Sequence, residues 1–269
     1  MSITGGLEQA LIRGHALRCR AIQMFTKSSG RWRERYLKRD EIALFRATRE
    51  SLNINPVISH AGYLINLAAP DDQIYEKSCS AMIEELTRCE QLGIDYLVVH
   101  PGHHRGLGEA FGIGKVAEAL NRIMDVTRGS SVSVALETMA GQGTTLGGTF
   151  EELAAIMEAV AENDRVALCL DLCHIFAAGY DIRSRAVYDG VFARIDNTIG
   201  LQKLKVIHVS DSKRECGSRV DRHEDIGKGM IGIEPFRWVM EDERLKYVPK
   251  ILETPTDLEN ITILENLAR

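Results

Sequence analysis

Short apolar runs alternate with longer amphipathic stretches along most of this chain. The runs are rich in Val, Ile and Leu, and several lead directly into His, Glu or Asp, as in Lys205-Val-Ile-His-Val-Ser-Asp211. The stretches between them carry apolar residues at helical spacing. The pattern predicts strands at residues 21–25, 56–60, 96–102, 131–137, 166–170, 205–211 and 250–253. It predicts helices at residues 7–19, 40–52, 71–92, 107–128, 150–162, 184–199 and 236–240, and a last helix at the C-terminus.

Strands that alternate with helices predict parallel βαβ units and hence an α/β fold. Six of the seven predicted strands end at a residue type that binds metals. In a barrel the C-terminal ends of all strands meet at one mouth, whereas in an open sheet they lie along a line. We therefore predict a TIM-type (β/α) barrel. No change of composition indicates a linker, so residues 1–269 are predicted to form a single domain.

The start of the chain departs from a complete eight-stranded barrel. A helix in a (β/α)₈ unit normally follows a strand, but only six turn-forming residues, Met1 to Gly6, precede the first predicted helix. We therefore expect the first barrel strand to be missing. The remaining seven strands would leave unpaired edges at residues 21–25 and 250–253, and the barrel would have a weak seam there.

Composition and charge limit the classes of function. The chain has 269 residues and a formal net charge of −5, so no global field attracts nucleic acid. No apolar run is long enough to span a membrane, and the N-terminus has no signal segment, which predicts a cytoplasmic protein. The six cysteines are scattered, which is typical of free thiols rather than of a disulfide framework.

The residues at the strand ends and in the loops after them suggest a metal site. Imidazoles mixed with carboxylates fit Zn²⁺, and fit Mn²⁺ or Fe²⁺ less well. The set is too large for one four-coordinate ion, and suits two or three ions if a carboxylate bridges. Such ions activate water and hold the oxygens of a phosphoryl group, which favours phosphodiester hydrolysis. The candidates are His60, His100, Glu137, Asp171, His174, His208, Asp221, His223 and Glu253.

Basic and aromatic residues follow the same strand ends. On an acidic protein, a group of basic loop residues suggests a rim that binds a nucleic acid backbone. Tyr63 and Trp32 lie in such loops, where an aromatic side chain can pack or can wedge beside an extruded nucleotide. The basic residues are Lys27, Arg31, Arg33, Lys213, Arg214, Arg219 and Arg222.

Several segments resemble the endonuclease IV family of apurinic/apyrimidinic (AP) endonucleases, and together they cover nearly the whole chain. They are Phe25-Thr-Lys27, His60-Ala-Gly-Tyr63-Leu-Ile-Asn66-Leu67, His100-Pro-Gly102, Glu137 with Ala140-Gly-Gln-Gly143, Asp171-Leu-Cys-His174 through Asp181, His208-Val-Ser-Asp211-Ser-Lys213, Gly217 through His223, Gly227-Lys-Gly229 through Gly232, and Leu252-Glu253-Thr254.

The resemblance implies a TIM barrel with three zinc ions, with Mn²⁺ as an alternative in one site. It implies cleavage of double-stranded DNA 5′ to abasic sites, which leaves a 3′-hydroxyl, and removal of 3′ blocking groups. By motif position, one zinc takes His60, His100 and Glu137. A second takes Glu137, Asp171, His208 and Glu253, and a third takes His174, Asp221 and His223.

The resemblance also implies roles for single residues. Glu137 and Glu253 are the expected catalytic carboxylates. Tyr63 matches a position that holds distorted DNA, and the family's intercalating arginine aligns at Gly30, beside Arg31. The expected DNA-binding residues are Tyr63, Arg31, Lys213, Arg219 and Arg222, in a protein that acts as a monomer.

Two other functions stay open on the sequence. A sugar isomerase or epimerase on the same barrel also uses His, Glu and Asp ligands, but it needs one or two ions and leaves Asp221-x-His223 without a role. A damaged-DNA binder that has lost catalysis with its first strand is the second alternative. The complete set of ligand candidates argues against that loss.

Overall fold

The computed structural model describes residues 1–268, and its main feature is a sheet of seven parallel strands. Strand order along the sheet follows chain order, as expected for successive βαβ units. The strands are β1 (Ile22–Met24), β2 (Val57–His60), β3 (Tyr96–Val99), β4 (Ser133–Glu137), β5 (Val166–Asp171), β6 (Leu204–Val209) and β9 (Lys250–Leu252). The strands predicted from the hydrophobic pattern are therefore all present, and their parallel order with connecting helices is that of the predicted α/β barrel class.

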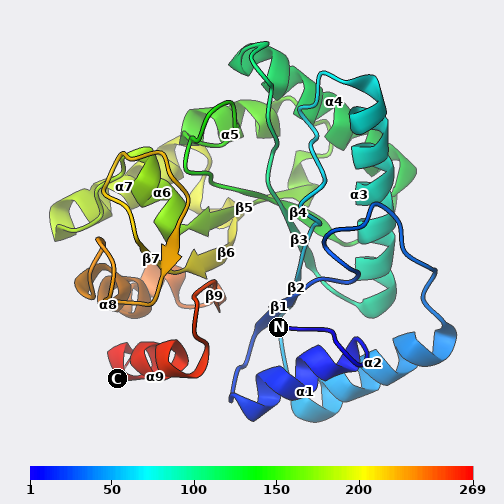
Figure 1. Ribbon diagram of the computed structural model, residues 1–269, viewed down its shortest axis with the longest axis horizontal. Coiled ribbons are helices and arrows are strands. Elements are labelled where there is room, and N and C mark those ends of the chain that lie inside the picture. The colour runs from blue at the N-terminus through cyan, green and yellow to red at the C-terminus, as the bar shows by residue number, and fades with distance from the viewer. Residues whose placement is uncertain (269) are drawn as a thin grey trace. The chain divides into compact units, whose positions relative to one another are not determined.

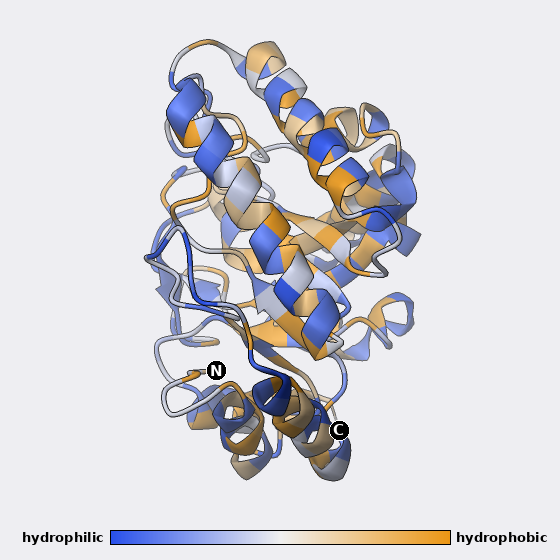
Figure 2. Ribbon diagram, turned by 90° about the vertical axis from the view of Figure 1, so that its right-hand side faces the viewer, coloured by the Kyte–Doolittle hydropathy of each residue, from blue (hydrophilic) through white to orange (hydrophobic). Residues whose placement is uncertain are grey.

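Helices connect the strands at nearly every step, as the amphipathic pattern predicts. They are α1 (Glu8–Ala16), α2 (Arg39–Leu52), α3 (Asp72–Leu92), α4 (Glu109–Val126), α5 (Phe150–Glu158), α6 (Leu172–Ala178), α7 (Arg185–Thr198), α8 (Glu234–Glu241) and α9 (Leu258–Leu267). Figure 2 shows hydrophilic and hydrophobic residues alternating around them. Three short 3₁₀ turns, Asn163–Arg165, Leu201–Lys203 and Glu243–Leu245, precede strands β5, β6 and β9.

The chain divides into two compact units. The first comprises residues 1–136 and 156–167. Within it β1 to β4 pair in parallel, α1 packs on α2, and α3 packs on α4 (Figure 1). Its core includes Phe45, Leu86 and Leu120, which are fully buried. Burial of such side chains is the main stabilising contribution to the unit.

The second unit comprises residues 137–155 and 168 onward. Within it β6 pairs in parallel with β5 and β9, and α8 packs on α9 (Figure 1). A two-stranded antiparallel hairpin, β7 (Asp211–Ser212) and β8 (His223–Glu224), follows β6. The predicted strand at residues 205–211 is therefore split, because the chain leaves the sheet after Val209 and pairs again in this hairpin.

The expected absence of a first barrel strand is confirmed. Residues 1–7 form turns, and no strand precedes α1. The amino group of Met1 donates a hydrogen bond of 2.5 Å to the carbonyl of Gln23 in β1. Of the described strands, β2 alone pairs with β1 and β6 alone pairs with β9. That the seam lowers stability stays a prediction.

The helix α6 was not predicted. It begins directly after β5, with the carboxylate of Asp171 accepting a hydrogen bond from the backbone amide of His174 at 2.7 Å. Because this cap ends the strand and starts the helix within one residue, no turn residues mark the boundary. The cysteines are all free, as predicted, and among residues 1–268 no helix is both long and apolar enough to cross a membrane.

Candidate metal centre

Most of the candidate ligands lie where the parallel strands end. His60 is the last residue of β2, His100 follows β3, and Glu137 is the last residue of β4. Asp171 ends β5 and His208 is the penultimate residue of β6. These strands are buried along most of their length, so each apolar run fixes the position of the polar side chain at its end.

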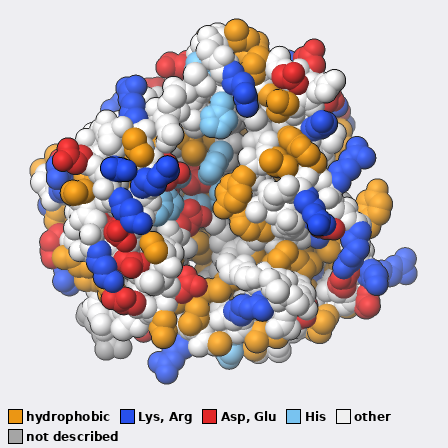
Figure 3. Space-filling model, in the orientation of Figure 1, with side chains coloured by type: hydrophobic (Ala, Val, Ile, Leu, Met, Phe, Trp, Pro, Cys, Tyr) orange, Lys and Arg blue, Asp and Glu red, His pale blue; other side chains and the backbone are white. Residues whose placement is uncertain are grey.

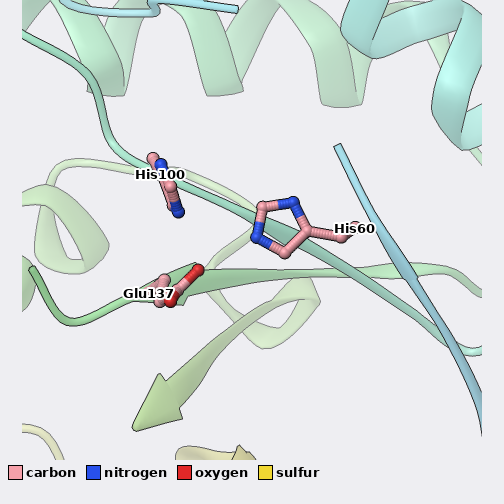
Figure 4. A group of neighbouring side chains, drawn as sticks. All are labelled: His60, His100 and Glu137. Atoms are coloured by element: carbon pink, nitrogen blue, oxygen red, sulfur yellow. The ribbon is translucent and has the colours of Figure 1, made fainter. Parts of the chain in front are cut away.

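The first group consists of His60, His100 and Glu137. A ligand atom of each lies within 4.8 Å of the others, and the three side chains point toward one another (Figure 4). The two imidazoles meet edge to face, with ring centroids 5.1 Å apart. Glu137 is fully buried, and β4, which it ends, pairs with β3 in register.

The second group consists of Glu137, Asp171, His208 and Glu253, whose ligand atoms also lie within 4.8 Å of one another. The Nδ1 atom of His208 lies 3.1 Å from Oε1 of Glu137 and 3.5 Å from Oε1 of Glu253. Glu137 is thus a member of two groups. A carboxylate has two oxygens, so one side chain can serve both.

The third group forms where α6 meets the loop that leads to β8. The Nε2 atoms of His174 and His223 each lie 3.2 Å from an oxygen of Asp221, and 3.4 Å from each other. Asp171, His174 and His223 also form a potential ligand set, because a ligand atom of each lies within 4.8 Å of the others. All nine candidates from the sequence therefore fall into these three groups.

Backbone carbonyls orient three of the imidazoles. The Nδ1 atoms of His60, His174 and His223 lie 2.8, 2.8 and 2.7 Å from the carbonyl oxygens of Ala61, Thr138 and Glu253. A carbonyl can only accept, so each Nδ1 carries a proton, and in the neutral ring the lone pair is then on Nε2. This arrangement is typical of histidines that bind a metal.

A buried carboxylate oxygen supports a cation here. Oδ2 of Asp171 is buried and accepts no hydrogen bond among the described residues, although His208 and His223 lie 3.8 and 3.9 Å away. An unpaired buried anionic oxygen is costly unless positive charge is placed beside it. The residues present therefore fit bound metal ions.

The charges around the buried histidines also favour a bound cation. Burial disfavours protonation of His174, but Asp171, Asp221 and Glu137 outweigh it and raise the pKa of His174 well above its ordinary value. The same balance, with Cys169, Glu253 and Glu137 opposing burial, raises the pKa of His208. The carboxylates thus create a strongly negative site that favours positive charge.

The donor set favours zinc by its chemistry. Imidazole nitrogen and carboxylate oxygen are ordinary Zn²⁺ ligands, and these three groups have three or four protein donors each. Cys173 is also near, grouped with Asp221 and His223. Burial raises the pKa of the Cys173 thiol to about 12, which keeps it protonated. A thiol in that state is a poor ligand.

The predicted basic rim is largely exposed in the second unit. Lys213, Arg214, Arg219 and Arg222 are exposed around the β7–β8 hairpin, and Figure 3 shows Lys and Arg side chains gathered over this part. The backbone amide of Arg219 donates to the carbonyl of Ala177 at 2.8 Å, which ties the loop to α6. The backbone of Arg219 is therefore held against the helix that carries His174.

In the first unit Tyr63 and Arg31 are exposed, and Tyr63 lies against His60 of the first group. Tyr63 is 67% exposed, although the centroid of its ring lies 5.4 Å from that of Phe25 and 6.1 Å from that of His60. Arg31 is within 3.9 Å of Glu34. Both positions are accessible to a large partner.

Lys27 corrects one expectation from the sequence. It was expected on the basic rim, but its side chain is buried, donates to the carbonyl of Trp32 at 2.9 Å and lies 3.7 Å from Glu85. Glu85 itself is 1% exposed and accepts from the amide of Gly62 at 3.1 Å. Lys27 therefore holds the loop together and is not available to bind a phosphate.

Comparison with known proteins identifies the family. The pattern of the xylose isomerase-like TIM barrel family of AP endonucleases matches residues 14–268. A protein named probable endonuclease 4 from Chloroflexus aggregans is 46% identical over 275 aligned residues, which cover 100% of this chain and 96% of that protein.

Solved structures extend the comparison. Endonuclease IV from Thermus thermophilus has a TM-score of 0.88 and 36% identity, covering 100% of this chain and 96% of that one. A D-tagatose 3-epimerase-like protein has a TM-score of 0.75 at 17% identity, covering 98% of this chain and 92% of that one, which shows a shared fold alone. On the match of residues 14–268 and on full-length identity to endonuclease 4, this chain belongs to the endonuclease 4 family of metal-dependent DNA endonucleases.

Proposed function

We propose that this chain is a DNA repair endonuclease with three zinc ions. In this proposal it hydrolyses the phosphodiester 5′ to abasic sites, leaves a 3′-hydroxyl, and removes 3′ blocking groups. The observation that carries the proposal is the place of Glu137 in two ligand groups at once. A shared carboxylate is how a protein holds two ions close together, and paired ions suit phosphodiester hydrolysis. The family membership of the chain supports the choice of DNA as substrate.

The proposed ligands follow the three groups. One ion takes His60, His100 and Glu137. A second takes Glu137, Asp171, His208 and Glu253. The third takes His174, Asp221 and His223, and Mn²⁺ is the alternative ion for one of the sites.

Within this proposal the residues divide the work. Bound zinc lowers the pKa of water and offsets the charge that develops on phosphate oxygens. Glu137 is fully buried, so its position is fixed by the side chains packed around it. Glu253 lies 3.5 Å from Nδ1 of His208 in the second group and is partly exposed, so in this proposal its carboxylate is the group that would accept a proton from a water entering from solvent.

The exposed residues serve binding. In this proposal Lys213, Arg219 and Arg222, which are exposed, neutralise phosphates of the DNA backbone. Tyr63 presents an exposed ring that fits between or beside bases where the duplex is distorted, and Arg31 adds a cation on the same unit. Intact DNA resists such distortion more than DNA that lacks a base, which gives selectivity. A monomeric, cytoplasmic enzyme stays a prediction.

The test is incision of a duplex with one abasic site by Glu137→Gln. Gln keeps the shape but removes the charge shared by two groups, so we expect incision to fall about a thousandfold while the variant still binds the duplex. Glu50→Gln, a change of the same kind at an exposed helix position, should leave the rate unchanged. Near wild-type turnover of Glu137→Gln would contradict the proposal.

Further assays separate two other functions from this one. The fold shared with an epimerase-like protein leaves sugar isomerisation as the alternative enzyme. Epimerisation of a free ketose without incision of DNA would favour it, and so would one bound ion per chain. Binding of abasic DNA by the wild type with no incision would indicate a binding protein.

A further inference from the structure

The carboxylate of Asp211 gathers five backbone amides. Asp211 begins β7, and its side chain is fully buried. Oδ1 accepts from the amides of Ser212 at 2.7 Å and Ile231 at 2.9 Å. Oδ2 accepts from the amides of Gly227, Gly229 and Gly232 at 3.0, 3.0 and 3.3 Å. One side chain therefore holds both ends of an excursion of the chain, the long loop of residues 212–232.

The donors make a specific demand on this side chain. Every group that faces the two oxygens is an N–H, so only an acceptor fits. Burial raises the pKa of the Asp211 carboxyl above its ordinary value, and the amides oppose that shift. A side-chain amide would turn an NH₂ toward backbone N–H groups and leave them unpaired, which is costly in a buried place.

The excursion carries two candidate ligands. Residues 212–232 include Asp221 and His223 of the third group. In the hairpin Asp211 stands opposite Glu224, and Ser212 stands opposite His223. The carboxylate is thus next to the pair that sets the position of His223. Further bonds close the loop, with the amide of Met230 donating to the carbonyl of Ser212 at 2.8 Å.

Gly229 shows how closely the loop approaches the carboxylate. A Cβ atom at this position would stand 2.4 Å from Oδ1 of Asp211 and 2.4 Å from the carbonyl of Ser212. Both distances are far below contact, and one of the two atoms is backbone. The Gly227-Lys-Gly229 segment therefore has a structural reason: its backbone must lie against Asp211.

The rest of the third group is held by other means. His174 is on α6, where Asp171 caps the helix and the carbonyl of Thr138 accepts from its Nδ1. Loosening residues 212–232 would therefore displace Asp221 and His223 and leave His174 in place. The second group has no residue in this excursion at all.

We propose that Asp211 is a positioning residue that sets the zinc affinity of the third group by fixing the loop that carries Asp221 and His223. This inference rests on the proposed function, in which that group binds an ion. It makes retention of the third ion depend on a side chain that is not a ligand.

The test is zinc binding, measured by competition with a chelator of known affinity and by elemental analysis after desalting. For Asp211→Asn we expect the weakest-bound ion to lose affinity about 10- to 100-fold, so that zinc content falls by one ion, with the other two retained. Gly229→Ala keeps the Asp211 carboxylate but displaces it, because the added methyl group contacts Oδ1. This variant should produce the same loss of zinc.

Two controls separate positioning from general destabilisation. Asp242→Asn removes another buried carboxylate of the same unit, one that accepts from Tyr188 and Arg244 away from the ligand groups. Gly190→Ala adds a methyl group where nothing lies within 4 Å. Both should keep the zinc content of the wild type, even if Asp242→Asn lowers the melting temperature.

The outcomes distinguish the two proposals. Wild-type zinc content and affinity in both Asp211→Asn and Gly229→Ala would overturn the role of Asp211 while leaving the endonuclease proposal intact. Equal loss of all ions in these variants would also overturn it, because that result indicates general unfolding of the site. A wild-type protein with no third ion would instead contradict the proposed function.

Discussion

Two loops at the ends of parallel strands are held by buried polar side chains of opposite character. In the first unit, Asn66 holds the loop after β3: its Oδ1 accepts from the amides of Ala68 and His103 at 3.1 and 2.8 Å, and its Nδ2 donates to the carbonyl of His103 at 3.2 Å. In the second unit, Asp211 holds the loop after β6 by accepting alone.

The difference follows from what each loop offers. The loop after β3 presents an N–H and a C=O from the same residue, so only a side chain that both donates and accepts satisfies it. The loop after β6 turns amides inward at several glycines, so it needs an anion. A carboxylate and a side-chain amide have nearly equal shapes, but they are therefore not interchangeable at Asn66 or at Asp211. Each of these residues holds a loop that lies next to candidate ligands.

The largest effect on stability is expected from Gly102→Ala. Its φ is +118°, and an added Cβ would meet Oδ1 of Asn66 at 2.3 Å. Backbone strain from the positive φ and displacement of the Asn66 side chain together should lower the unfolding free energy by about 4 kcal/mol. Urea unfolding measures this cost.

Gly106→Ala is the matched control for that substitution. Gly106 lies in the same loop with φ +90°, but nothing is within 4 Å of the added atom. It should cost only the backbone strain, about 1–2 kcal/mol. Equal costs for the two variants would show that the approach to Asn66 is unimportant.

Asn66→Asp tests the donor requirement directly, and its cost should depend on pH. An ionised Asp would face the carbonyl of His103 with an oxygen instead of an N–H, at a cost of about 2–3 kcal/mol at neutral pH. Burial and this carbonyl should raise its folded pKa above the unfolded value of about 3.9. The folded state then binds the proton more tightly, so stability is retained below pH of about 3.9 and is lost as pH rises through the folded pKa.

The measurement is the difference in unfolding free energy between Asn66→Asp and the wild type across pH 3 to 8 (roughly the range that spans both pKa values). A difference that does not change with pH would mean that the side chain at this position accepts only, as in the second unit. The comparison between the two loops would then fail.

The smallest effect on stability is expected from Lys213→Ala, on the loop that Asp211 holds. The Lys213 side chain is about half exposed, and its Nζ is 3.9 Å from Glu224, so its loss should change unfolding free energy by less than about 0.5 kcal/mol. Binding of abasic duplex should weaken at low salt, and the slope of log affinity against log salt should fall by about 1. An unchanged slope would remove Lys213 from the phosphate contacts.

The sequence predicted what depends on local pattern. Buried strands such as β2 and β5 appear as apolar runs, so His60 and Asp171 could be placed at strand ends. The assignment of candidates to each ion came from the family resemblance. The structure brings together the sets of the first two groups, but it groups His174 and His223 with Asp171, and Asp221 with Cys173 and His223. Metal binding by any of them stays a prediction.

What the sequence did not predict depends on partners distant in the chain. Lys27 is buried because Glu85, on a helix that comes much later, lies beside it. Asn66 and Asp211 appear in the sequence as ordinary polar loop residues, since their partners are backbone amides and carbonyls that no side-chain pattern shows. The Gly227-Lys-Gly229 segment was the one feature of the sequence that pointed to the loop held by Asp211. The need for glycine there became clear only from the distance between Gly229 and Asp211.

The central claim is that the three groups of His, Asp and Glu side chains hold metal ions for DNA cleavage. Native mass spectrometry of the wild-type chain, after desalting without chelators, measures it most directly when the same sample is assayed on an abasic duplex. The account predicts about three zinc ions per chain and incision that is lost when the ions are removed and restored when zinc returns. One ion or none in a sample that cleaves the duplex at full rate would contradict it.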